Sequence, residues 1–277
     1  MNLTRRRLCN LLLLSALPMP ALANSCSLTI GLFPNLPANK LATIYQPLAT
    51  YLTQQLDCRV RLASAKDFRS FYQATRDKQF DLIVTAPNLA WLAMTESRYQ
   101  PLASYTNRVS GVLVSKRGVH LDSLSSCRSK TIAFTDPLTI VSQLGLSYLQ
   151  SHGLHADIDY QLTTYNNHTN AALAVVLGKA DCAMIGKLPY SQMPTDIQHN
   201  LQIIAKTNEV TSQFIMGNPD LPDTARLRAA LLGFAQTPAG LTFITEQHLG
   251  GIVPASPKDV APAKPYALIT QALLTAL

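Results

Sequence analysis

Three short turn segments carry the polar side chains that could bind a ligand. In the first, Asp136 and Pro137 follow an apolar stretch and open a helical pattern, and Thr139 adds a hydroxyl group. Asp at an N-cap and Pro at the first helical position are favoured there, and the free backbone N–H groups that follow form an anion site. The alternative is a helix that is simply well capped.

The second turn contains Thr85, Ala86 and Pro87, and the third contains His168. His168 can donate a hydrogen bond to an oxyanion when it is protonated or in the right tautomer. The alternative is a loop histidine that faces solvent. In open α/β sheets, ligands bind beyond the carboxyl ends of the strands. We therefore expect the three turns to lie at the edges of one cleft.

The common catalytic and metal-binding motifs are absent from the sequence. It contains no nucleophile elbow, no HExxH, no paired metal-ligand spacing and no Gly-rich phosphate loop. We therefore expect a binding protein without catalytic residues, cofactor or metal. A hydrolase that uses His168 with a nearby Ser or Asp is the remote alternative.

A repeated order of strands and helices positions these turns. Segments 28–33, 60–63 and 82–84 are predicted as strands, and apolar residues recur every three or four positions between residues 41 and 56, as in an amphipathic helix. Asp67 and Asn88 are predicted N-caps of two further helices. This alternation indicates a parallel sheet with helical crossovers.

The same order returns in the second half of the chain, which predicts an α/β fold of two lobes. Each lobe is expected to be a mostly parallel sheet flanked by helices. Lobe 1 comprises residues 24–108 and 208–277, and lobe 2 comprises residues 109–207. Two crossings between lobes imply a hinge that closes around a ligand. The predicted lobe 2 elements are strands 131–134, 160–163 and 182–185 and helices 138–152 and 170–178, and the predicted helices 223–236 and 238–248 return to lobe 1.

Residues 1–23 have the form of a secretory signal peptide that is cleaved after Ala23. Three arginines precede an apolar run, and small residues follow it. A membrane anchor is less favoured because Pro18 and Pro20 interrupt a run too short to span a bilayer. The pair Arg5 and Arg6 also fits a twin-arginine signal, so the export route stays open. Localisation in the periplasm follows.

The charge pattern gives little support to nucleic-acid binding. The net charge of +7 falls to +4 when the three leader arginines are removed. Neither a run of Lys and Arg nor basic residues interleaved with aromatics occurs. A small anionic ligand is compatible with this balance.

Four cysteines remain after cleavage, an even number that suggests disulfides in an exported protein. Cys26 and Cys58 precede strands that should be neighbours, and neighbouring strands lie ~4.8 Å apart, within disulfide reach. Cys127 and Cys182 hold similar positions in lobe 2. One bridge in each lobe is predicted. A zinc site or free thiols are the alternatives.

The order of these blocks resembles the substrate-binding proteins of phosphate, phosphite and phosphonate ABC transporters. The resemblance extends from about Leu28 to Gly186 and more faintly to about Gly251. It implies a type II periplasmic binding fold that takes a tetrahedral oxyanion between its lobes. The matching blocks are GLFPNL, QPLATYL, DFRSFYQATRDKQFDLIVTAP, TIAFTDP and HTNAALAVVLGKADCAMIG.

The resemblance also implies the site residues. By position, Phe68 stands where the family often has a ligand-contacting Tyr, and Thr85 with Ala86 forms the next pocket turn. Thr139 matches the first hydroxyl of the family's Ser-Thr-Ser turn, and His168 matches a pocket His. Apolar residues then replace two family hydroxyls before Ser142. These departures favour a ligand that is less charged or more apolar than a phosphonate, because a buried dianion with few donors is costly to desolvate.

The implied partner is a membrane ABC transporter permease, to which a monomeric binding protein delivers its ligand. A sensory protein that reports its ligand state to a membrane kinase or cyclase has the same fold, and the sequence does not separate the two roles.

Overall fold

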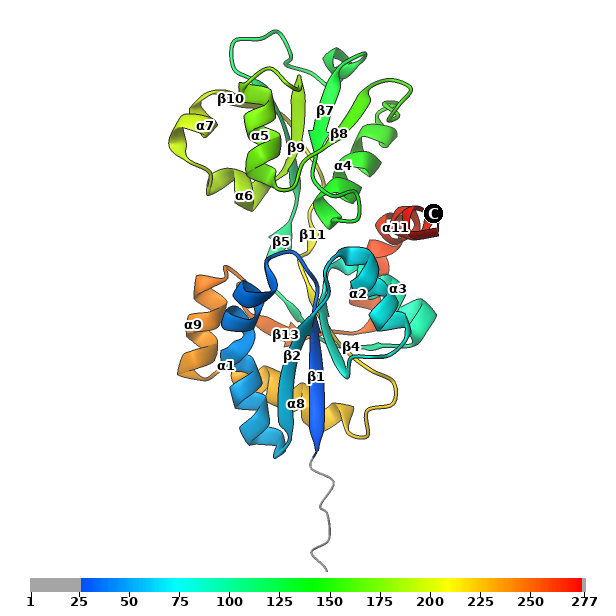
Figure 1. Ribbon diagram of the computed structural model, residues 1–277, viewed down its shortest axis with the longest axis vertical. Coiled ribbons are helices and arrows are strands. Elements are labelled where there is room, and N and C mark those ends of the chain that lie inside the picture. Colours follow the sequence, from blue (N-terminus) through cyan, green and yellow to red (C-terminus); the bar gives the residue numbers. More distant parts are fainter. Residues whose placement is uncertain (1–25, 276–277) are drawn as a thin grey trace, which may run out of the picture.

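Apolar segments of the first lobe form a six-stranded sheet in the computed structural model, which describes residues 26–275 (Figure 1). Its order is β13-β4-β12-β3-β1-β2. β3 lies inside the sheet, and its residues Leu82, Ile83 and Val84 are fully buried, as expected of a strand covered on both faces. The strands are β1 (Ser27–Leu32), β2 (Arg59–Ser64), β3 (Leu82–Thr85), β4 (Gln100–Tyr105), β12 (Phe214–Gly217) and β13 (Ile252–Pro254).

Helices cover the faces of this sheet. The predicted apolar face of α1 is buried at Leu41, Leu48 and Leu52, and Pro47 lies inside this helix. Asp67 caps α2 as predicted, because its side chain accepts a hydrogen bond from Ser70 N. The helices are α1 (Ala38–Leu56), α2 (Phe68–Arg76), α3 (Pro87–Ser97), α8 (Thr224–Phe234), α9 (Pro238–Glu246), α10 (Pro257–Val260) and α11 (Lys264–Thr275), with a 3-10 turn at Ala261–Ala263.

The second lobe is built around a five-stranded sheet of order β10-β6-β9-β7-β8. Its helices pack on both faces (Figure 1). Its strands are β6 (Gly111–Lys116), β7 (Thr131–Phe134), β8 (Gln161–Thr164), β9 (Cys182–Gly186) and β10 (Leu201–Lys206), and its helices are α4 (Ile140–Ser151), α5 (His168–Val176), α6 (Lys187–Ser191) and α7 (Thr195–His199), with a 3-10 turn at Ser125–Cys127.

Two short strands join the lobes. β5 (Arg108–Val109) and β11 (Val210–Thr211) pair in antiparallel orientation between the two sheets. Arg108 stabilises this crossing by donating to Thr211 Oγ1 at 3.3 Å and to the Glu209 carbonyl at 2.8 Å. The two-lobed α/β fold is therefore confirmed.

The sheets are more mixed than the sequence suggests. β1 pairs in parallel with β2 and β3, and β7 pairs in parallel with β8 and β9. The other pairings in both sheets are antiparallel, because each crossing adds strands that run against the βαβ units.

The two cysteine pairs differ. Cys26 and Cys58 form the predicted disulfide, with their Cα atoms 4.6 Å apart. Cys127 and Cys182 lie side by side, but both are buried free thiols whose sulfur atoms are 3.7 Å apart. The predicted second disulfide is therefore not formed in the structure, because the sulfurs are in van der Waals contact and not at bonding distance.

The predicted leader, residues 1–23, lies outside the described residues. Among residues 26–275, no helix has both the length and the apolar character needed to cross a membrane. The same residues contain no group of three or more His, Cys, Asp or Glu side chains placed to hold a metal ion.

Candidate ligand-binding site

The turn after β3 places Thr85 and Ala86 at the end of a central strand of lobe 1. Ala86 is the N-cap of α3, and Pro87 is its first residue. The Thr85 side chain is fully buried, and its hydroxyl has no hydrogen-bond partner within residues 26–275. A buried hydroxyl without a partner is costly, which makes Thr85 a candidate for contact with a bound molecule.

Asn88, predicted as the cap of α3, is instead the second residue inside this helix. The prediction was wrong because Pro87 already occupies the first helical position, so the cap falls on Ala86. The Asn88 side chain is fully buried and donates to the Leu138 carbonyl of lobe 2 at 3.0 Å.

The turn after β7 presents Thr139 at the start of α4. Thr139, rather than Asp136, is the N-cap, and its hydroxyl accepts a hydrogen bond from Ser142 N at 3.3 Å. Asp136 stabilises the turn one step earlier by accepting from Leu138 N at 2.8 Å. The helix therefore begins two residues later than predicted. Its free N-terminal N–H groups lie beside the Thr139 hydroxyl.

Three hydroxyl groups form a small network in this turn. Thr139 Oγ1 lies 3.2 Å from Thr135 Oγ1 and 3.0 Å from Ser142 Oγ. Thr135 and Ser142 are buried, whereas Thr139 is partly exposed. The two buried hydroxyls therefore orient the Thr139 hydroxyl. Thr135 was not among the predicted site residues, although its position between β7 and Asp136, at the end of a strand, could have indicated it.

His168 is the first residue of α5, and Asn167 caps that helix by accepting from Asn170 N at 2.8 Å. Gly186 N, at the end of β9, donates to His168 Nδ1 at 3.4 Å. Burial lowers the pKa of His168 to about 4, so the ring is neutral at neutral pH. Because Nδ1 accepts a hydrogen bond, the proton is on Nε2, which is then a neutral donor.

Apolar side chains of both lobes meet around these turns. Phe68, the first residue of α2, is 8% exposed and its ring centroid lies 6.3 Å from that of Phe33. Both belong to one contiguous hydrophobic cluster that continues into lobe 2 and the hinge. We use the name interlobe cluster for five of its residues, together with Leu138, which packs against it: Phe33, Phe68, Ala86, Ile140, Val210 and Leu138.

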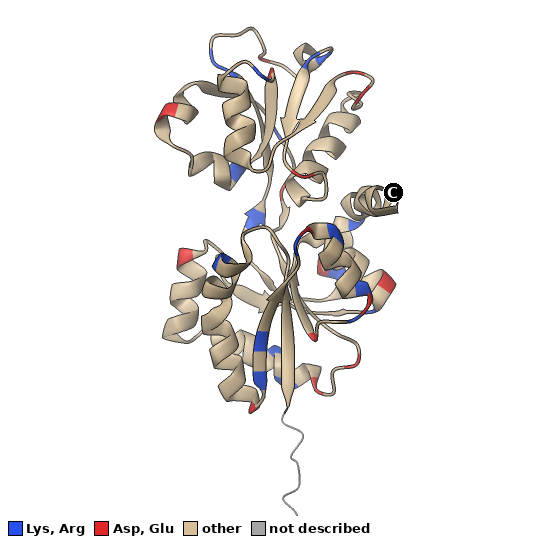
Figure 2. Cartoon of the chain, viewed as in Figure 1, with Lys and Arg blue, Asp and Glu red and all other residues tan. Residues whose placement is uncertain are grey.

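Basic side chains near the turns are engaged elsewhere. Lys66 lies 3.9 Å from Asp67 on the surface, and Lys187 pairs with Glu209 at 3.1 Å. Arg69 donates to the carbonyls of Leu273 and Leu274, and the Arg108 guanidinium is bound in the hinge. Figure 2 shows Lys and Arg spread over both lobes rather than gathered at one place. The recognition groups of the three turns are therefore neutral.

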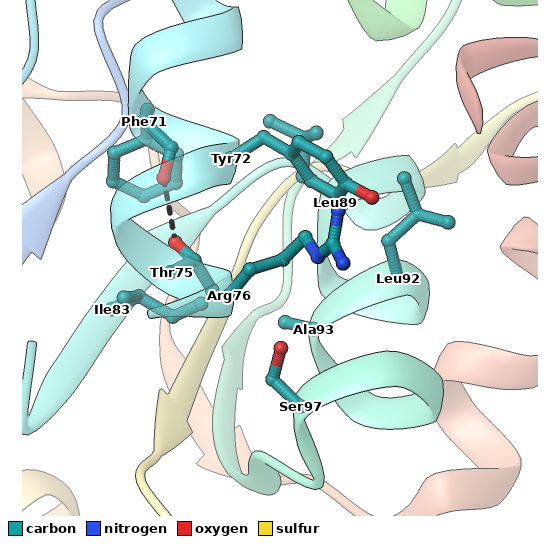
Figure 3. Close-up of a pocket in the computed structure, with 9 residues that line it drawn as sticks. All are labelled: Phe71, Tyr72, Thr75, Arg76, Ile83, Leu89, Leu92, Ala93 and Ser97. Atoms are coloured by element: carbon teal, nitrogen blue, oxygen red, sulfur yellow. Dashed lines mark hydrogen bonds between the residues drawn. The ribbon is translucent and has the colours of Figure 1, made fainter. Parts of the chain in front are cut away.

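A small cavity lies within lobe 1, between α2, β3 and α3 (Figure 3). Its volume of about 10 Å³ is that of a single water molecule. Thr75 closes one side by donating to the Phe71 carbonyl at 2.9 Å. This cavity is too small for the expected ligand. Its lining residues are Phe71, Tyr72, Thr75, Arg76, Ile83, Leu89, Leu92, Ala93 and Ser97.

Four of the predicted residues lie at strand ends or in the interlobe cluster, and their role in ligand binding stays a prediction. Thr139 and His168 lie at the carboxyl ends of the neighbouring strands β7 and β9, and Phe68 and Ala86 join the interlobe cluster. Two α/β lobes, a double hinge and such strand-end turns define the class of two-lobed binding proteins.

Residues 30–260 match the family described as the phosphonate ABC transporter, periplasmic substrate-binding protein. The chain belongs to this family, as its sequence blocks indicated. Members of the family are periplasmic, bind a small-molecule ligand and work with an ABC transporter permease.

Solved structures share the fold at low sequence identity. A binding protein of a phosphonate ABC transporter from Pseudomonas aeruginosa is 15% identical, with 90% of this chain and 87% of that chain covered and a TM-score of 0.74. PhnD1 from Prochlorococcus marinus, in complex with methylphosphonate, is 15% identical, with 89% and 98% covered and a TM-score of 0.76. The aliphatic sulphonate binding protein SsuA from Escherichia coli is also 15% identical, with 91% and 94% covered and a TM-score of 0.61.

Proposed function

We propose that this protein captures a small organic oxyanion of the phosphonate class between its lobes and delivers it to an ABC transporter permease. The observation that carries the proposal is the set of neutral donors at the ends of adjacent strands of lobe 2. Thr139 and His168 supply side-chain donors there, and the start of α4 supplies free backbone N–H groups.

Each side chain has a distinct role in this proposal. Within the turn, the Thr139 hydroxyl donates to Ser142 Oγ or to the Asp136 carbonyl, and in the proposed complex this one hydrogen turns to a ligand oxygen. His168 donates to a second oxygen through Nε2. Thr85 offers a buried, unpartnered hydroxyl of lobe 1 at the end of β3. Phe68, together with Ala86, packs against the organic substituent.

The charge of the ligand follows from the donor set. The described Lys and Arg side chains near the turns pair with carboxylates or backbone carbonyls of the protein. The residue after Thr139 is the buried, apolar Ile140, which adds no side-chain donor. Desolvating a dianion among few neutral donors is costly. We propose a ligand that is singly charged or that carries an apolar substituent.

Ligand binding closes the hinge. The lobes are proposed to divide at residues 24–108 with 208–277 and 109–207, and a ligand held by both lobes stabilises the closed form through its additional contacts. The mature chain starts after Ala23, acts as a monomer and requires no cofactor or catalytic step.

The test is isothermal titration calorimetry on the chain that starts at Asn24. The panel comprises methylphosphonate, the monomethyl ester of methylphosphonate, butanesulfonate, inorganic phosphate and sulfate. We expect binding of the organic oxyanions, with the singly charged ones preferred over inorganic phosphate. Absence of heat from every oxyanion, together with an unchanged melting temperature, would reject the proposal, because a ligand that binds only the folded state must raise that temperature.

A further inference from the structure

One buried amide joins both lobes and the C-terminal helix. Asn88 Nδ2 donates to the Leu138 carbonyl in lobe 2 at 3.0 Å and to Thr270 Oγ1 in α11 at 2.9 Å. Asn88 and Thr270 are fully buried. Within residues 26–275, the other side-chain hydrogen bonds between the lobes involve Glu209, which lies beside the hinge. The bond from Asn88 to Leu138 therefore links the lobes at a separate place. The acceptor residue, Leu138, directly precedes Thr139 in the turn after β7.

A second buried amide holds the same turn. The fully buried Gln143 of α4 donates to the Pro137 carbonyl, so two consecutive carbonyls, at Pro137 and Leu138, are bound by amide side chains. The Oδ1 of Asn88 and the Oε1 of Gln143 have no partners within the described residues. An unpartnered buried oxygen costs stability, so these amides contribute through their N–H donors. Thr139 follows directly on the residues that they hold.

Helix α11 lies beyond residues 30–260, the range that matches the family. It is fixed to lobe 1, because Arg69 donates to the carbonyls at its end and Gln271 donates to Glu96 at 2.7 Å. It packs against α3 of lobe 1 and also against α4 of lobe 2. Figure 1 shows it beside the gap between the lobes, below α4.

We propose that Asn88 is a positioning residue and that α11 acts with it as a brace between the lobes. The brace holds the Pro137–Leu138 carbonyls, and with them the Thr139 hydroxyl, against lobe 1 in the closed arrangement. Its effect on affinity rests on the proposed function, whereas its effect on lobe closure does not. In this proposal the Asn88 contacts between the lobes form only in the closed arrangement, so the brace raises the closed population before ligand arrives and tightens binding.

The test compares Asn88→Ala with Asn218→Ala. Asn218 is a buried amide that also donates to backbone carbonyls, those of Phe80 and Lys78, but entirely within lobe 1. Both variants should lower the melting temperature by similar amounts. Only Asn88→Ala should weaken methylphosphonate binding, by about tenfold, and only Asn88→Ala should increase the radius of gyration of the ligand-free protein in small-angle X-ray scattering.

A second pair of variants, with less disruptive substitutions, tests the proposal if Asn88→Ala does not fold. Thr270→Val keeps the side-chain volume and removes the acceptor of Asn88, whereas Thr275→Val makes the same change at an exposed position of α11. Thr270→Val should shift the radius of gyration in the same direction as Asn88→Ala, and Thr275→Val should not.

Equal radii of gyration for the Asn88 and Asn218 variants would overturn the brace, whatever the ligand. If the wild-type protein binds no oxyanion while Asn88→Ala still expands it, the proposed function fails and the brace stands. If binding is intact and equally tight in both alanine variants, the proposed function stands and the brace fails.

Discussion

Lobe 1 and lobe 2 bring opposite chemistry to the place where they meet. Lobe 1 contributes aromatic and aliphatic surface through Phe33, Phe68 and Ala86, with one unpartnered hydroxyl at Thr85. Lobe 2 contributes a hydroxyl network around Thr139 and a neutral histidine. From this difference we propose that the oxyanion group of a ligand lies against lobe 2 and its substituent against lobe 1.

The lobes also differ in how their interiors are held together. A disulfide joins the starts of the first two strands of lobe 1, whereas Cys127 and Cys182 of lobe 2 remain thiols. A covalent link that restricts the unfolded chain stabilises the lobe that carries it. The stability of lobe 1 is therefore expected to depend on the oxidation of Cys26 and Cys58, whereas the stability of lobe 2 depends on packing alone.

The largest expected effect is on the disulfide. Replacing Cys26 and Cys58 together by Ala should lower the free energy of unfolding by about 3 kcal/mol, as measured by guanidinium denaturation. Replacing Cys127 and Cys182 by Ala should cost less, because no cross-link is lost there. A larger loss for the lobe 2 pair than for the lobe 1 pair would reverse the comparison.

The next largest effect is on the polar half of the site. Thr139→Val removes the proposed ligand donor and the N-cap of α4, and should weaken methylphosphonate binding by about 30-fold, since hydrogen bonds to charged groups contribute about 1.5–3 kcal/mol. Thr139→Ser keeps the hydroxyl and should retain most of the affinity. Calorimetry that gave both variants the wild-type affinity would remove Thr139 from the site.

A smaller effect concerns the protonation of His168. Its pKa is lowered from 6.5 to about 4 by burial, so the unfolded chain takes up the proton first as the pH falls. Stability due to this residue is therefore complete above pH 6.5 and is lost progressively towards pH 4.

The measurement is the melting temperature across that pH range for wild type and for His168→Gln, which keeps an N–H donor but does not titrate. The difference between the two proteins should shrink as the medium becomes acidic, because only the wild type loses stability through this group. Parallel curves would show that His168 is solvated and does not belong to the buried polar half.

The smallest effect is on the apolar half of the site. Phe68→Tyr adds a hydroxyl donor to lobe 1 and should increase the affinity for inorganic phosphate several-fold relative to butanesulfonate, because the added donor serves the more highly charged ligand. Phe71→Tyr, a matched change in the core of the same helix, should lower stability without changing this ratio. A ratio that stays constant in Phe68→Tyr would place Phe68 outside ligand contact.

The sequence by itself determined the features that depend on neighbouring residues. Periodic leucines predicted the buried face of α1, Asp67 predicted the cap of α2, and the spacing of Cys26 and Cys58 predicted their bond. These features follow from local dihedral preferences and from the pairing of adjacent parallel strands, so a short stretch of chain is sufficient to specify them.

Only the tertiary structure decided the features that depend on distant residues. Asn88 was expected to cap its own helix, yet its amide bonds to residues 50 and 182 positions away. Cys127 and Cys182 reach contact without a bond, because the packing of a 3-10 turn against β9 sets their separation. Helix α11 packs against α3 of lobe 1 and α4 of lobe 2. Such contacts form only when distant segments of the chain have folded against one another, so no short stretch of sequence specifies them.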